Sequence, residues 1–253
     1  MDIISYALDP SLVAAILVAL MLVGWRIGVQ RGRSLHNRNG TAPQFDSAGM
    51  AFMGLLLAFA FGISMSKFDQ RRLALVEDSN AIGDFYTCAT LLKEPIRSRL
   101  QGVIRGYAEE RLRLARLPSG SFDFENALQE FEQTHREMTI LVDQGLAAGT
   151  PIAVSLTNAL NAVTSNHAAR LAAIKDRLPG SVMALLLIST ITTAILIGRC
   201  EGYTGAADID GMILFAILIC SAIYVTLDLN RTEVGFIKVS QEPIERLVSS
   251  MQH

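Results

Sequence analysis

Cysteine and histidine are scarce in this sequence, and neither forms a pattern. Cys88, Cys200 and Cys220 lie far apart, are odd in number and include no CxxC spacing. This arrangement supports neither a disulfide framework nor a zinc site. The four histidines include no pair four residues apart and no HExxH motif. We therefore expect no bound metal.

Catalytic motifs are also missing. The sequence contains no GxSxG, P-loop or GxGxxG motif. Glu77 with Asp78 and Glu109 with Glu110 are acidic neighbours, but adjacent helical residues point about 100° apart and cannot act as a close pair. We interpret both pairs as parts of solvated faces, and His167 on its apolar stripe as a core or interface histidine. The sequence thus predicts a protein that is not an enzyme, with no catalytic residue and no cofactor.

Charged residues are absent from four long runs in a chain that is 51% hydrophobic. The runs are Ser11–Trp25, Ala48–Met65, Ser181–Gly198 and Gly211–Leu227. Each is at the short end of the ~20 residues that a helix needs to cross a bilayer. Together they predict an integral membrane protein whose first partner is the lipid bilayer. The net charge of −2 argues against nucleic acid as a partner.

The lack of charge at mid-membrane depth also bears on the kind of membrane function. Proton-coupled transporters usually need ionisable groups there, because these groups carry the coupling. A passive pore does not, since apolar constrictions and backbone dipoles can gate and select. Active transport is therefore disfavoured, whereas the sequence is compatible with a passive pore.

The order of segments predicts an all-α membrane protein with a helical soluble domain inserted between spans two and three. Proline and glycine breaks divide this inserted segment into four amphipathic helices, and no alternating run predicts a sheet. The predicted parts are a first transmembrane hairpin at 1–66 (spans about 11–29 and 48–66), the soluble helical domain at 67–179, a second hairpin at 180–228 (spans about 181–198 and 211–227) and a tail at 229–253.

The second span is the stretch around which the chain is organised. No proline follows it until Pro95, so we predict one continuous helix that leaves the membrane. Small residues recur every four positions and provide a helix-packing face: Gly54, Ala58, Gly62 and Ser66. Phenylalanines recur every seven positions on a second face: Phe45, Phe52 and Phe59. The two faces suit a pore-lining helix in an oligomer, or alternatively packing against lipid or other helices.

The third span carries hydroxyl groups near its middle, at Ser189, Thr190 and Thr193. Such hydroxyls can bond carbonyls of the preceding turn or of a neighbouring helix. They can also line a water-filled path for an ion, and we keep them as secondary pore-lining candidates. The structural interpretation is the favoured one.

Basic residues near the spans bear on orientation. With four spans, both termini share a side with residues 67–179, and nine lysines and arginines flank the spans there against five on the other side. This total predicts that the domain and both termini are cytoplasmic. The dense arginines of the first loop favour the opposite orientation, with that loop in the cytoplasm.

Five sequence blocks carry a family resemblance: LLLAFAFGISMSKFDQRR at 55–72, VEDSNAIGDFY at 76–86, LLKEPIRSRLQGVIRGYAEERL at 91–112, NHAARLAAIKDRLP at 166–179 and DLNRTEVGFIKVSQEPI at 228–244. In this order they resemble the bestrophin-like family of bacterial membrane proteins, named for a distant similarity to bestrophin anion channels. The resemblance implies a homo-oligomeric ring, with a pentamer as one candidate, in the bacterial cytoplasmic membrane. It also implies a pore lined by the second span that conducts an inorganic ion such as chloride.

The chain departs from bestrophins proper in two respects. Its second span has phenylalanines seven apart instead of apolar neck residues every four, and only Asp228 and Glu233 are acidic near the end of the fourth span. Calcium gating is therefore not carried over. Two hypotheses follow: an oligomeric ion channel, or a non-conducting membrane adaptor whose helical domain binds a soluble partner.

Overall fold

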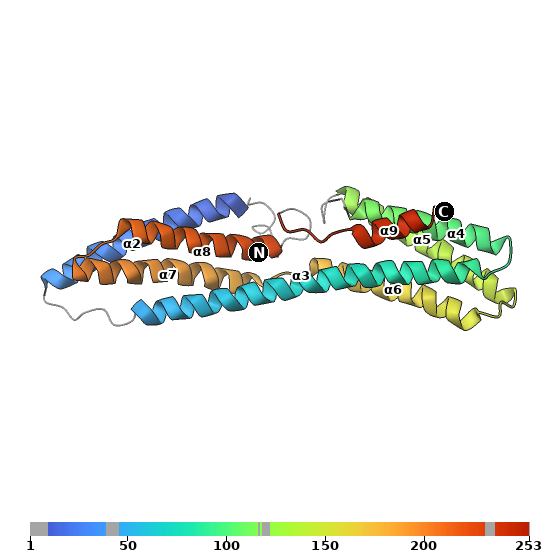
Figure 1. Cartoon of the computed structure of the whole chain (residues 1–253), viewed down its shortest axis with the longest axis horizontal. Helices are drawn as coiled ribbons and strands as arrows, with labels where there is room; N and C mark the ends of the chain where they lie inside the picture. The colour runs from blue at the N-terminus through green and yellow to red at the C-terminus, as the bar shows by residue number, and fades with distance from the viewer. Residues whose placement is uncertain (1–9, 39–45, 116, 118–121, 231–235, 253) are drawn as a thin grey trace. The chain divides into compact units, whose positions relative to one another are not determined.

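Helices make up all the regular secondary structure in the part of the chain that the structure describes. This computed structural model describes residues 10–38, 46–115, 117, 122–230 and 236–252. The helices, drawn in Figure 1, are α2 (Pro10–Asn37), α3 (Asp46–Thr90), α4 (Ile96–Leu114), α5 (Phe122–Ala147), α6 (Ala153–Lys175), α7 (Gly180–Thr204), α8 (Ile209–Leu229) and α9 (Glu242–Ser250). The predicted all-α class is confirmed for these residues.

Four stretches of the described chain are long and apolar enough to cross a membrane, which confirms the predicted number of spans. They are Ser11–Asn37, Ser47–Thr90, Ala153–Thr204 and Ile209–Leu229. The third stretch includes two helices, since α6 ends at Lys175 and α7 begins at Gly180. The uncharged run Ser181–Gly198 lies in α7, so α7 is the spanning helix.

The predicted continuous helix after the second apolar run is confirmed by α3, which is 45 residues long. Nothing in its sequence interrupts the backbone hydrogen bonds until Pro95, which has no N–H to donate. The helix accordingly ends at Thr90, and α4 begins at Ile96 directly after this proline. Two compact units share α3, because one takes its residues up to Ser66 and the other begins at Lys67.

The first unit combines Met1–Ser66 with Arg177–Arg231, and therefore contains α2, α7, α8 and the first part of α3. Its apolar core takes side chains from all four helices, including Met21, Met53, Leu186 and Ile223. Asp208 begins α8 by accepting a hydrogen bond from the Gly211 amide at 2.9 Å. The apolar runs thus pack against one another as well as presenting an apolar exterior.

The second unit combines Lys67–Asp176 with Thr232–His253. Its core joins α3, α4, α5 and α6 through fully buried residues such as Phe85, Leu100, Met138 and Leu156. The short helix α9 adds Ile244 and Val248 to the same core, and Met251 joins them directly after the helix. The chain end is therefore part of the second unit, although it is far from the rest of that unit in sequence.

Candidate functional site

The first candidate site is the exposed side of α3 within the first unit. Met53, Ala60 and Ser64 are 3%, 1% and 0% exposed and define the buried side of this helix segment. Phe52 and Phe59 are 53% and 62% exposed. At about 100° per residue these two rings lie together, roughly a quarter turn from the buried side. The third predicted aromatic residue, Phe45, lies outside the described residues.

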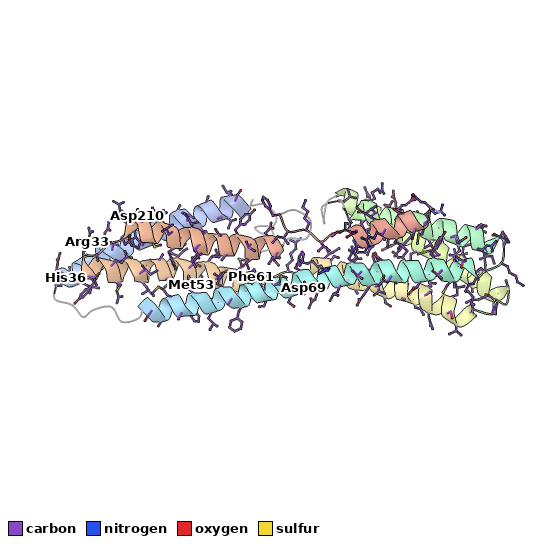
Figure 2. The ribbon with its side chains drawn as sticks, in the orientation of Figure 1. Arg33, His36, Met53, Phe61, Asp69 and Asp210 are labelled. Atoms are coloured by element: carbon purple, nitrogen blue, oxygen red, sulfur yellow. The ribbon has the colours of Figure 1, made fainter. Side chains whose placement is uncertain are left out.

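The small residues of α3 also lie on the exposed side of the helix. Gly54, Ala58, Gly62 and Ser66 are all exposed. A Cβ atom added at Gly54 or Gly62 would meet no described atom within 4 Å. Figure 2 labels two residues of this segment, Met53, which is 3% exposed, and Phe61, which is 42% exposed. Close helix packing at these two glycines must therefore use something other than this chain's described helices.

The hydroxyl groups of α7 lie inside the first unit. Ser189, Thr190 and Thr193 are 8%, 0% and 2% exposed. Ser189 and Thr190 donate to the Leu186 carbonyl at 2.9 and 2.8 Å, and Thr193 donates to the Gly49 carbonyl of α3 at 3.4 Å. These bonds are the ones that the structural interpretation predicts, whereas a water-lined path would need hydroxyls that face solvent.

The closest helix pair in the first unit is α2 with α7, where glycines on both helices meet the partner's backbone. A Cβ at Gly28 would lie 2.8 Å from the Arg199 amide and closer still to the Ile195 carbonyl oxygen. Gly32, Gly198 and Gly202 have equally close backbone neighbours on the partner helix. The sequence shows these glycines four residues apart, a spacing that marks both helices as candidates for close packing but does not show which helices meet.

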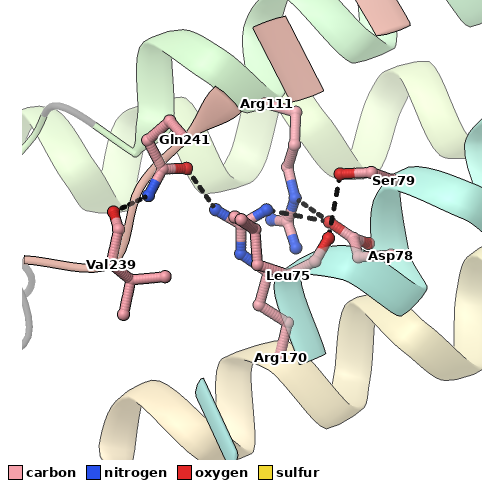
Figure 3. Close-up of polar contacts among 7 residues, drawn as sticks. All are labelled: Leu75, Asp78, Ser79, Arg111, Arg170, Val239 and Gln241. Carbon is pink, nitrogen blue, oxygen red and sulfur yellow. Dashed lines mark hydrogen bonds and ion pairs between the residues drawn. The ribbon is translucent and has the colours of Figure 1, made fainter. Parts of the chain in front are cut away.

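The second candidate site is a buried ionic cluster in the second unit, drawn in Figure 3. The Asp78 carboxylate of α3 accepts from Arg111 Nε of α4 at 2.7 Å and from Arg170 Nη1 of α6 at 2.9 Å, both at Oδ2. These three residues are 0%, 1% and 6% exposed. Arg170 Nη2 also donates to Gln241 Oε1 at 3.2 Å, and Gln241 Nε2 donates to the Val239 carbonyl at 3.1 Å. The cluster thus links three helices and the segment before α9.

The interpretation of Asp78 as part of a solvated face is wrong. Its carboxylate has no solvent exposure, because α4 and α6 cover this turn of α3 and supply a guanidinium each. The sequence places Asp78, Arg111, Arg170 and Gln241 in four separate blocks, and only the fold brings them together. One signal was present: each of the four residues lies in a block that carries the family resemblance.

An aromatic stack borders the cluster. Phe131 of α5 stacks on the His167 ring with centroids 4.5 Å apart, and Arg111 Cζ lies 5.1 Å from the centre of the Phe131 ring. Burial, followed by the Arg111 charge, lowers the pKa of His167 to about 4. Burial and the same charge lower the pKa of Arg170 to about 10. At neutral pH the histidine is therefore neutral and Arg170 is positive.

No group of three histidine, cysteine or acidic side chains is arranged to hold a metal ion among the described residues. In the part of the chain that the structure describes, the geometry is all-helical, with four membrane-type helices and a buried arginine-rich cluster. A family model, the bestrophin-like domain, matches residues 11–244, and the chain belongs to the bestrophin-like family. Neither the curated proteins nor the solved structures include a match to this chain.

Proposed function

We propose that this protein is an oligomeric ion channel, with anions as the conducted ions and the apolar part of α3 lining the pore. The observation that carries the proposal is the exposed side of α3, where Phe52 and Phe59 are more than half exposed. Aromatic rings on a pore-lining helix can form an apolar constriction that gates by excluding water. Membership in the bestrophin-like family supports a relation to ion channels.

The small residues of α3 support the oligomeric part of the proposal. Gly54, Ala58 and Gly62 are exposed within one chain, so a second copy can approach this stripe closely. Repeating that contact around an axis would close a ring of identical copies, with the pentamer as the candidate that the resemblance implies. In this arrangement Phe52 and Phe59, which lie beside the small-residue stripe, would point toward the axis.

The placement in the cell is part of the same proposal. The channel lies in a bacterial cytoplasmic membrane, with residues 67–179 and both termini on the cytoplasmic side. The excess of lysine and arginine flanking the spans on that side supports this orientation.

A second candidate function is a non-conducting membrane adaptor. Apolar side chains remain exposed on the second unit, where Leu91, Ile140 and Val154 are 63%, 58% and 74% exposed. Exposed apolar groups of this kind can bind a soluble partner. In this case α3 would face lipid, and the spans would hold no path for ions.

Ion flux from liposomes that contain the purified full-length protein tests the proposal. We expect chloride flux above that of empty liposomes. In the Phe52→Ala and Phe59→Ala variants this flux should rise, or its selectivity change, by on the order of twofold or more, because a ring is removed from the constriction. The control is Leu214→Ala, which shortens an apolar side chain that is 69% exposed on α8, a membrane-type helix that the proposed contact between copies does not include.

The controls separate a pore from a general loss of stability. Leu214→Ala should leave the flux at the wild-type level. Flux equal to empty liposomes in the wild type and all variants would contradict the channel and favour the adaptor. Equal changes in Phe59→Ala and Leu214→Ala would contradict the assignment of the pore-lining face.

A further inference from the structure

Two arginines near the ends of the membrane helices α2 and α7 take no part in the proposed channel. Arg31 of α2 is exposed and Arg199 of α7 is part-exposed. Within the described residues, neither side chain forms an ion pair or a hydrogen bond. Nε is the nitrogen of the Arg199 guanidinium that is buried without a partner, so its Nη atoms are the ones that an external acceptor can reach.

The two arginines lie at the same level of the helix pair. A Cβ atom added at Gly28 would lie 2.8 Å from the Arg199 amide, and one added at Gly32, directly after Arg31, would meet the Arg199 carbonyl oxygen. The backbone of Arg199 therefore lies between Gly28 and Gly32 along α2. Both arginine side chains leave the pair within about one helical turn of each other.

The arginines also lie on one side of the helix pair, away from the carboxylate that binds Trp25. The hydrogen bond from Trp25 Nε1 to Glu201 Oε2 marks one side of the glycine contact. At about 100° per residue, Arg31 lies about 120° from Trp25 around α2, with the contact residue Gly28 between them. Arg199 lies about 160° from Glu201 around α7, with the contacting glycines of that helix between them. Arg31 and Arg199 therefore share the side opposite Glu201.

Exposed apolar side chains lead along both helices to these arginines. Leu20 of α2 and Ile188 of α7 each precede their arginine by eleven residues, a spacing that returns a helix to within about 20° of the same face. They are 45% and 62% exposed. Eleven residues span about 16 Å, which is about half of the ~30 Å hydrocarbon core of a bilayer. The apolar surface thus has the length of one leaflet and ends in two guanidinium groups.

We propose that this side of the α2 and α7 pair binds an anionic phospholipid. Its phosphate would accept hydrogen bonds from Arg31 and Arg199, and its acyl chain would lie along Leu20 and Ile188. Guanidinium groups form charge-assisted hydrogen bonds with phosphate oxygens, and basic groups beside membrane helices attract anionic headgroups. Trp25 lies at the same level, and tryptophan is enriched at the headgroup depth of membranes.

A general attraction of arginines to headgroups predicts a different result, because it treats all exposed arginines at one depth alike. Arg33, labelled in Figure 2, is exposed and follows Arg31 by two residues. It therefore lies at nearly the same depth but about 160° away around α2. The proposed site needs Arg31 and does not need Arg33.

Native mass spectrometry of the purified full-length protein in detergent tests the proposal. The protein is titrated with phosphatidylglycerol and, separately, with phosphatidylcholine that has the same acyl chains. Both lipids contain a phosphate, but the choline ammonium of the second lipid cancels its net charge. The first phosphatidylglycerol per chain should bind about tenfold more tightly than the first phosphatidylcholine.

Three variants and one matched control locate the effect. Arg31→Gln and Arg199→Gln should each weaken the binding of phosphatidylglycerol by about fivefold or more and leave that of phosphatidylcholine unchanged. Arg199→Lys keeps the charge and should keep the preference for phosphatidylglycerol. Arg33→Gln is the control and should bind as the wild type does. The fluorescence of Trp25 checks that the helix pair stays intact in each variant.

Three outcomes would overturn the proposal. Equal affinity of the wild type for both lipids would show that the site does not select negative charge. Equal losses in Arg33→Gln and Arg31→Gln would assign the binding to a general attraction between arginines and headgroups. A change in the mass of the assembly in Arg31→Gln, with lipid affinity unchanged, would assign this side of the helices to a contact between copies. None of these results depends on whether the protein conducts ions.

Discussion

The His167 imidazole occupies a position where protonation works against folding. Its ring stacks on Phe131, and its Nδ1 is buried without a partner among the described residues. The titratable groups that act on it are Arg111, His135, Arg170 and Asp78, and the first three disfavour an additional positive charge. Burial is the larger cause of its pKa of about 4. The histidine therefore acts as a neutral aromatic member of the core at pH 7.

This pKa predicts how the stability of the second unit depends on pH. The unfolded chain binds a proton near pH 6.5 and the folded chain near pH 4, so the unfolded state holds more protons between these values. Stability should therefore fall as the pH drops below 6.5, by about 1 kcal/mol at pH 5 after allowance for the partial exposure of the ring. Hydrogen exchange of α5 and α6 in the full-length protein measures this loss.

The matched variant for that measurement is His167→Gln, which keeps a polar side chain but does not titrate. The difference in exchange between pH 6.5 and pH 5 should become smaller in this variant. An unchanged difference would assign the pH dependence to other groups, such as His135, whose pKa is also lowered by burial.

At the residue scale, the sequence predicted the environment of His167 but not that of Asp78. The apolar stripe of α6 correctly suggested a packed position for His167, because helical periodicity reports which side of a helix faces the core. The same periodicity gave no indication that Asp78 is buried. A carboxylate is buried only where partners are supplied, and its partners here are 33 and 92 residues away in the sequence. Local patterns do not contain such pairings.

At the scale of elements, the contact between α2 and α7 is set by glycines. Trp25 lies at this contact, where its backbone faces Gly198 and its indole Nε1 donates to Glu201 Oε2 at 2.8 Å. It is the single tryptophan of the chain. Its fluorescence therefore reports directly on the separation of the two helices.

Gly28→Ala should destabilise this contact by about 1–3 kcal/mol, because the added methyl group would overlap the backbone of α7 and force the helices apart. Denaturant titration in detergent, followed by Trp25 fluorescence, measures the change. The control is Gly180→Ala at the start of α7, where no described atom lies within 4 Å of the new Cβ. Equal destabilisation by both substitutions would show that close helix approach is not the cause.

The sequence predicted the elements better than their contacts. Proline and glycine breaks set the helix ends because they act locally, so α3, α4 and the four apolar runs were predictable. The sequence did not show which small residues meet a partner helix, since both α2 and α3 carry small residues every four positions. Only the arrangement of the helices shows that Gly28 is enclosed within the chain while Gly62 is open.

At the scale of the whole molecule, the open stripe on α3 connects the fold with the proposed assembly. Gly62→Leu adds a large side chain where the chain itself has no described atom within 4 Å, so the fold of one copy should be unchanged. If a second copy packs on this stripe, the added bulk should weaken association by about tenfold to a hundredfold, which corresponds to 1–3 kcal/mol of overpacking. Light scattering in detergent as a function of protein concentration measures this shift.

The control for added apolar bulk is Ala19→Leu, at an exposed position of α2. It should leave the mass of the assembly unchanged, because the proposed contact does not include α2. Chloride flux should decrease together with the oligomer in Gly62→Leu, since a pore between copies exists only in the assembly. A monomeric variant that still conducts would place the path within one chain and contradict a pore lined by α3 from several copies. A variant that remains oligomeric would instead assign the exposed stripe to lipid, and the contact between copies to another face.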